Sequence, residues 1–201
     1  MTEGSSSARR RSQRAQSLVE FAISSIVLLL LAMGLIDLSR AFYYSVALQG
    51  AAREGARHAA WFNTAGRYNP YLDDADVFTA VTQALSGAGI PAGQIKQIQN
   101  GSCLNPTDGN ASNNKPYPAA AFPPSAGQVY VYQCYTSPAP SSLQTGSRLG
   151  APAPGDNSQK LGDVNVSVLM NFQLITPLIQ GIFGNGINLA YNEHFTIQGK
   201  P

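Results

Sequence analysis

Apolar residues follow different periods in different parts of this chain, and each period predicts a different element. Residues 18–36 are apolar at almost every position, and about 20 such residues are enough to cross the hydrocarbon core of a bilayer as an α-helix. The run continues without proline into an Ala-rich stretch that ends at Trp61 and favours helix. We therefore predict one helix over residues 17–61, roughly 65 Å long, of which about half projects beyond the membrane.

Strand patterns lie farther along the chain. Residues 128–135 are rich in Val and Tyr, and residues 163–172 and 187–197 alternate apolar and polar side chains, which is the period of a strand. The side chains predicted to face the core are Val164, Val166, Val168, Met170 and Phe172 in the second segment, and Ile187, Leu189, Tyr191, Phe195 and Ile197 in the third, where Glu193 is a misfit.

Strands with one apolar face form a small antiparallel sheet that needs a cover, and the projecting helix can supply it. The predicted fold class is α+β, with a long N-terminal transmembrane helix packed against a small antiparallel β-sheet. Residues 1–16 form a disordered, Ser/Arg-rich leader, and residues 62–201 form an α+β domain. Within that domain, residues 100–127 and 136–160 are rich in Asn, Pro, Gly and Ser, which predicts irregular loops.

A second helix is predicted from Asp76 to about Leu85. Asp73 or Asp74 would cap its N-terminus and suit its dipole. Calcium binding by Asp73, Asp74 and Asp76 is the alternative, but the segment lacks the loop spacing and the late Glu of an EF-hand. We favour the capping role.

Small residues recur at every fourth position of the projecting half of the long helix. One row is formed by Ala47, Ala51, Gly55 and Ala59, and a second by Ala52, Ala56 and Ala60. Small side chains at this spacing allow another helix or a sheet to approach closely. A plain preference for Ala in helices gives the same composition, and the sequence does not decide between the two.

Charge is scarce and unevenly placed. Charged residues make up 12% of the chain and the formal net charge is +2, which gives no field to attract nucleic acid. The basic excess lies before the apolar run, at Arg9, Arg10, Arg11 and Arg14. By the positive-inside rule the N-terminus is cytoplasmic and residues from 37 onward are extracytoplasmic.

A cleaved signal peptide is the alternative to a membrane anchor. Its apolar region should have about 7–15 residues, which the run over residues 18–36 exceeds. Residues 45–47, Ser-Val-Ala, could serve as a cleavage site but lie well past the run. We favour an uncut anchor.

Few residues carry candidate chemistry. Cys103 and Cys134 are the only cysteines, and in an oxidising compartment they predict a disulfide that closes a loop of about 30 residues. His58 and His194 are the only histidines, and the chain has no G-x-S-x-G, H-E-x-x-H or P-loop motif. We predict no catalytic residue, no metal site and no cofactor, and therefore no enzyme.

Two charged positions flank the apolar run. Glu20 lies near its start, where an unpaired carboxylate costs a few kcal/mol in lipid. It either stays hydrated at the interface or meets a positive charge, such as the free N-terminal amine of a neighbouring subunit. At the other end, Asp37 and Arg40 are three residues apart and could pair with each other.

Three segments resemble the TadE/TadF-like family of Tad (Flp) pilus pseudopilins: residues 14–22, 34–42 and 51–57. The resemblance rests on the Glu-Phe pair near the start of the apolar run and on further charged positions inside these segments. The end of the second predicted long strand and the last strand, with Phe172 and Thr176-Pro177, also look like the family's tail. The charged family positions in this chain are Glu20, Asp37, Arg40, Arg53, Glu54 and Arg57.

The resemblance implies that a prepilin peptidase cuts between Ala15 and Gln16, which makes Glu20 the fifth residue of the mature chain. This chain has Ala15 where the family usually has Gly. The implied partners are the membrane, other pilin or pseudopilin subunits, the prepilin peptidase and the Tad assembly platform.

The predicted function is therefore that of a structural pseudopilin or minor pilus-assembly subunit of a Tad/Flp-type secretion system, located in the cell membrane. The alternative is a membrane-anchored extracytoplasmic binding module or adhesin with an uncut signal anchor.

Overall fold

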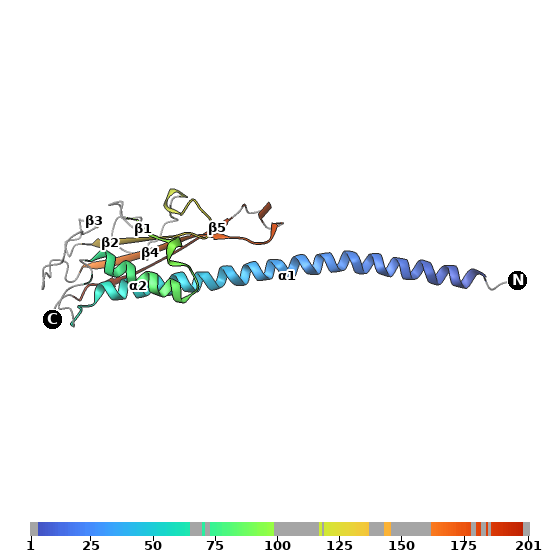
Figure 1. The fold of residues 1–201 in the computed structure, drawn as a ribbon, viewed down its shortest axis with the longest axis horizontal. Helices are drawn as coiled ribbons and strands as arrows, with labels where there is room; N and C mark the ends of the chain where they lie inside the picture. Colours follow the sequence, from blue (N-terminus) through green and yellow to red (C-terminus); the bar gives the residue numbers. More distant parts are fainter. Residues whose placement is uncertain are drawn as a thin grey trace.

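A single long helix runs out from a small sheet domain (Figure 1). The computed structural model describes residues 4–64, 70, 73–98, 117, 119–136, 143–145, 162–177, 180–181, 184 and 186–198, and only the backbone of residues 4–15, 134–136 and 143–145. The long helix, α1, covers Gly4–Ala60. It begins well before the expected residue 17, so the prediction of a disordered leader is wrong for residues 4–16. The Ser/Arg-rich segment contains no proline, and Arg and Ala favour helix.

The sheet contains the three predicted strands and two short ones. The predicted strands are β2 (Val129–Thr136), β4 (Asp163–Gln173) and β5 (Gly186–Thr196). They pair antiparallel in the order β2-β4-β5, with Val131 opposite Val168 and Val168 opposite Tyr191.

Two short strands extend the sheet, and one of them, β1, makes it mixed rather than purely antiparallel as predicted. β1 (Ile95–Gln97) pairs with β2 in parallel, and β3 (Leu143–Thr145) pairs with β2 in antiparallel fashion. Neither was predicted, because three residues are too few to show a period of two.

The second helix, α2, covers Asp74–Gly87 and is capped as predicted. The Asp73 Oδ1 accepts hydrogen bonds from the backbone N–H groups of Ala75 at 3.0 Å and Asp76 at 3.1 Å. These bonds satisfy two of the donors that a helix N-terminus leaves free. Capping is therefore the role of Asp73.

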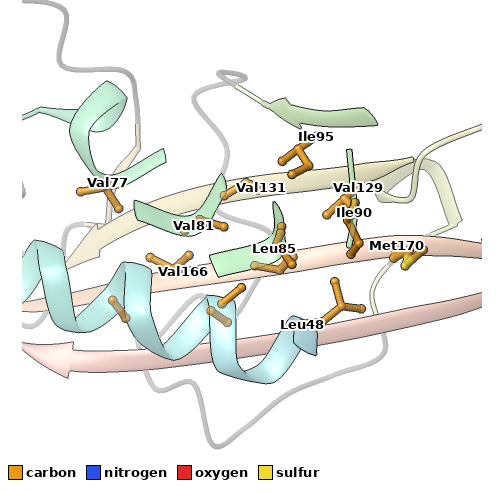
Figure 2. Packing of buried hydrophobic residues seen from close by; sticks show 14 of the residues in the cluster. Leu48, Val77, Val81, Leu85, Ile90, Ile95, Val129, Val131, Val166 and Met170 are labelled. Carbon is orange, nitrogen blue, oxygen red and sulfur yellow. The ribbon is translucent and has the colours of Figure 1, made fainter. Parts of the chain in front are cut away.

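The main core lies between the sheet and the two helices. The predicted inward face of β4 is buried along its whole length, from Val164 to Phe172. Figure 2 shows Leu48 of α1 and Val81 and Leu85 of α2 gathered over this face. The predicted inward residues of β5 are half-buried or buried except Ile187, which is 37% exposed.

The other face of β4 is also covered, although its residues are largely polar. Asn165, Ser167 and Leu169 are buried. A short 3-10 turn at Ala119–Ala121 lies over Leu169 and Tyr132. β4 lies between β2 and β5 in the sheet, and both of its faces are covered. It is therefore the most buried strand of this fold.

Candidate functional site

The stretch of α1 over residues 18–36 presents apolar side chains on every side. Among the described residues, α1 from Gln16 to Ala60 is the one helix long and apolar enough to cross a membrane. Each such side chain left in water forgoes about 1.5–3 kcal/mol, so this surface needs lipid or protein around it. The large exposed side chains between residues 18 and 36 are Leu18, Val19, Phe21, Ile23, Ile26, Val27, Leu28, Leu29, Leu30, Leu31, Leu35 and Ile36.

A buried carboxylate marks the point where α1 leaves the apolar run. Asp37 is 2% exposed. Its Oδ1 accepts a hydrogen bond from the backbone N–H of Ile175 at 3.0 Å, and its Oδ2 accepts one from that of Thr176 at 2.9 Å. The predicted pairing with Arg40 is present, with Nη1 at 3.3 Å from Oδ1. These charge-assisted bonds compensate for burying the carboxylate.

Aromatic contacts strengthen the same junction. The Arg40 guanidinium lies over the Phe172 ring, 5.2 Å from its centroid, and the Tyr44 ring lies 5.7 Å from that of Phe172. The Ser45 hydroxyl bonds to the Tyr191 hydroxyl. One face of α1, from residue 37 to residue 45, is therefore attached to the end of β4 and to the middle of β5.

The small residues of α1 lie farther along, where the helix meets both α2 and the sheet. Ala51, Gly55 and Ala59 are buried, and Ala47 is half-buried. A Cβ atom at Gly55 would collide with Cγ2 of Val81 and would lie 3.3 Å from Cγ1 of Val166. α1 therefore approaches its neighbours closely at Gly55. Composition alone did not decide between such an approach and a plain preference for small residues in helices.

The charged residues on this part of the helix lie on its surface. Arg53 is exposed. Arg57 donates two hydrogen bonds to Glu54, at 2.5 Å and 3.0 Å, an exposed pair that contributes little to stability. His58 Nε2 lies 3.0 Å from Asp76 Oδ2 and joins α1 to α2. An open hollow of about 260 Å³ lies beside this contact.

None of these groups forms a recognisable catalytic or metal site. Among the described residues, no group of three or more His, Cys, Asp or Glu side chains could hold a metal ion. The other histidine, His194, is exposed on β5, with Nδ1 4.0 Å from Asp163 Oδ2.

The predicted processing site lies near the start of the apolar run. Ala15 and Gln16 are consecutive residues inside α1. Gln16 Nε2 donates a hydrogen bond to Glu20 Oε1 at 3.1 Å, and both side chains are exposed. Cleavage at this bond and a role for Glu20 in assembly stay predictions.

The predicted disulfide also stays a prediction. Cys103 lies outside the described residues, and Cys134 lies in β2, where only the backbone is described. Most of the predicted loops over 100–127 and 136–160 lie outside the described residues as well.

Sequence reasoning missed the bond between α1 and the end of β4. Asp37 and Thr176 were both singled out in the sequence, but nothing in their spacing linked them. The available signal was the position of Asp37 immediately after the apolar run, because a carboxylate that is buried there needs hydrogen-bond donors.

Comparison with known proteins places the family resemblance in this same helix. Residues 15–57 match the model of the TadE-like protein family. No curated protein and no solved structure matches the chain. The matched stretch begins beside the predicted cleavage bond, includes Glu20, Asp37 and Arg40, and ends at Arg57. The similarity to the TadE-like family therefore lies in the helix that passes from the apolar run into the sheet domain.

Proposed function

We propose that this chain is a structural, single-pass subunit of a Tad/Flp-type pilus or secretion system. Its N-terminus lies in the cytoplasm, α1 crosses the cell membrane, and the sheet domain lies outside. The TadE-like match over residues 15–57 and the membrane-span candidate are together consistent with a Tad pilus-associated protein. The four arginines of the leader support this orientation by the positive-inside rule.

The observation that carries the proposal is the position of Asp37. It lies in the matched segment, one residue beyond the apolar run, and holds the backbone of Ile175 and Thr176. The membrane helix and the sheet domain are therefore joined by a fixed contact rather than a flexible linker. A subunit that is placed by its helix and presents its domain outside the membrane needs this rigidity.

The exposed apolar side chains of α1 support packing against other subunits. In a bilayer, helices associate through van der Waals contact and through polar pairs that lipid does not satisfy. Glu20 is exposed on this helix. After cleavage between Ala15 and Gln16, the new terminal amine of a neighbouring pilin or pseudopilin subunit would neutralise the Glu20 carboxylate in a low dielectric.

Processing by a prepilin peptidase is part of the proposal. The bond lies inside α1, so the first turns of the helix must open before the peptidase can cut it. We expect co-expression with the peptidase of the same system to give an intact mass that begins at Gln16. Ala15→Gly is the matched variant, since it restores the residue usual in the family. An unchanged mass for both proteins overturns the processing step and leaves an uncut membrane subunit.

Assembly tests the rest of the proposal. Glu20→Ala should reduce recovery of the protein with the Tad assembly platform and the other pilin subunits, while the anchored monomer is still made. Glu193→Ala, which removes a carboxylate from β5, is the matched control and should assemble normally. Equal recovery of both variants would contradict a pilin-like role and favour an anchored binding module or adhesin.

A further inference from the structure

The end of the β4–β5 hairpin lies beside the membrane helix rather than beyond it. The Thr176 hydroxyl donates a hydrogen bond to the backbone C=O of Met33 at 3.4 Å. Met33 belongs to the apolar run, about 5 Å along the helix axis inside the end of that run at Ile36. Figure 1 shows this end of β4 and β5 on the side of the sheet that faces the N-terminus of α1.

The apolar surface at this end of the hairpin is open. Ile175 is 58% exposed and Ile187 is 37% exposed. Leu174, the residue before Ile175, is buried in the core. The pattern predicted for β5 directed Ile187 toward the core, but the core does not extend to this end of the strand.

Among the described residues of this turn, several backbone polar groups at 174–176 are bonded within the protein. Asp37 accepts from the N–H groups of Ile175 and Thr176. Gln180 donates through its side chain to the Leu174 C=O at 2.6 Å and through its backbone N–H to the Thr176 C=O at 3.0 Å. Backbone that meets lipid must be satisfied in this way, because the hydrocarbon offers no partner.

Charge is also absent from this part of the sequence. Residues 164–192 contain no charged residue. The nearest charges are on α1: the buried Asp37 carboxylate, and Arg40, whose guanidinium lies against Asp37 and Phe172. A charged side chain at the centre of a membrane helix costs about 2.5–3.5 kcal/mol. A turn without charged residues, next to the paired Asp37 and Arg40, is therefore suited to a membrane surface.

We propose that the end of the β4–β5 hairpin, at Ile175–Pro177 and Ile187, inserts into the outer interface of the bilayer that α1 crosses. The occupant of this apolar surface is lipid, because Thr176 lies beside Met33. The end of the hairpin is therefore level with the last helical turn of the apolar run. Interfacial elements insert about 5–10 Å, which matches the position of Thr176 beside Met33. This contact gives the sheet domain a second attachment to the membrane and fixes its orientation. It rests on the proposed anchoring of α1.

Tryptophan quenching in lipid vesicles tests this insertion. Trp61 is the only tryptophan and is exposed at the far end of α1. In the wild-type chain, tryptophan emission therefore comes from a side chain in contact with water. The test variant combines Trp61→Phe with Ile175→Trp in the full chain, in vesicles of phosphatidylethanolamine and phosphatidylglycerol. Lipids brominated on their acyl chains should remove most emission from the test variant and leave Trp61 emission unchanged. Acrylamide in the buffer should quench the emission of Trp61 and leave that of the test variant nearly unchanged.

The other outcomes overturn the proposal in distinguishable ways. If acrylamide quenches the Ile175→Trp variant as strongly as it quenches Trp61, the hairpin faces water. If neither reagent quenches it, a protein subunit covers the surface instead of lipid. If the chain fails to float with the vesicles, the membrane anchoring in the proposed function fails together with this inference. Ile187→Trp in the same Trp61→Phe background repeats the measurement from β5.

Discussion

Asp37 and Thr176 are 139 residues apart in the chain, and the Oδ2 of Asp37 accepts a hydrogen bond from the backbone N–H of Thr176 at 2.9 Å. One residue follows the apolar run of α1, and the other follows the central strand of the sheet. Because the carboxylate also accepts from Ile175 and from Arg40, the contact holds the two elements in one orientation.

Removing the Asp37 carboxylate should loosen this junction. Asp37→Ala leaves the N–H groups of Ile175 and Thr176 without their acceptor, and a buried unpaired group costs about 1–3 kcal/mol. Thermal unfolding in detergent, followed by near-ultraviolet circular dichroism, should show a lower midpoint. Ser39→Ala, an exposed position on the same helix turn, is the control and should unfold like the wild type. Equal midpoints for both variants would show that the junction does not depend on Asp37.

Two glycines of α1 should respond to alanine in opposite directions. Gly55→Ala places a methyl group against the buried Val81 and Val166 side chains, and overpacking costs about 1–3 kcal/mol. A Cβ at Gly50 would meet nothing within 4 Å, so Gly50→Ala should stabilise the helix by about 0.5–1 kcal/mol. The same unfolding measurement compares them. Stabilisation by Gly55→Ala would mean that α1 does not approach α2 and β4 as closely as described.

Stability at high pH should depend on Tyr132. Burial raises the pKa of its phenol above the ordinary value of 10.0, and the neighbouring Tyr130 raises it further. The folded protein therefore keeps this proton to higher pH than the unfolded chain, so the contribution of Tyr132 is complete below about pH 10 and is lost as the pH rises further.

The matched variant for this pH dependence is Tyr132→Phe. The Tyr132 hydroxyl donates to the Ala121 C=O at 2.6 Å, so the variant should be less stable at neutral pH by about 1 kcal/mol. The difference between the two proteins should shrink above pH 10, as measured by denaturant unfolding at several pH values. A constant difference up to pH 11 would show that Tyr132 does not ionise on unfolding in this range.

The predicted disulfide is tested by mass. Alkylation of the protein without reduction should leave Cys103 and Cys134 unmodified, and a tryptic digest should contain the two peptides joined. Cys103→Ser and Cys134→Ser should each lower stability by about 2–4 kcal/mol, and by the same amount, since either removes the same bond. Two alkylated cysteines in the unreduced protein would refute the pairing.

Local patterns in the sequence were enough for most elements of the fold. The alternation over residues 163–172 predicted both the strand and its buried face, because side-chain direction in a strand has a period of two. Asp73 predicted the start of α2, because an N-cap is a contact between near neighbours. The extension of α1 back to Gly4 does not follow from composition, because a Ser/Arg-rich segment is also typical of disorder.

The candidate site was less accessible to sequence reasoning. Asp37 and Arg40 were singled out as a pair on one helix turn, but the backbone donors of Asp37 lie in a distant turn. The close packing at Gly55 could not be separated from helix propensity, since both favour small residues. No period in the sequence of residues 119–121 indicated that this turn lies over Leu169.

By itself, the sequence determined the membrane-span candidate, the α+β class, the three main strands of one sheet, and the resemblance carried by residues 14–60. These follow from periodicity, composition and short motifs, which act over a few residues. Only the tertiary structure decided that Asp37 is buried against Ile175 and Thr176, that Gly55 meets α2 and β4, and that Ile175 stays exposed beside the apolar run. These contacts depend on how segments far apart in the sequence pack together. Such packing leaves no local period in the sequence.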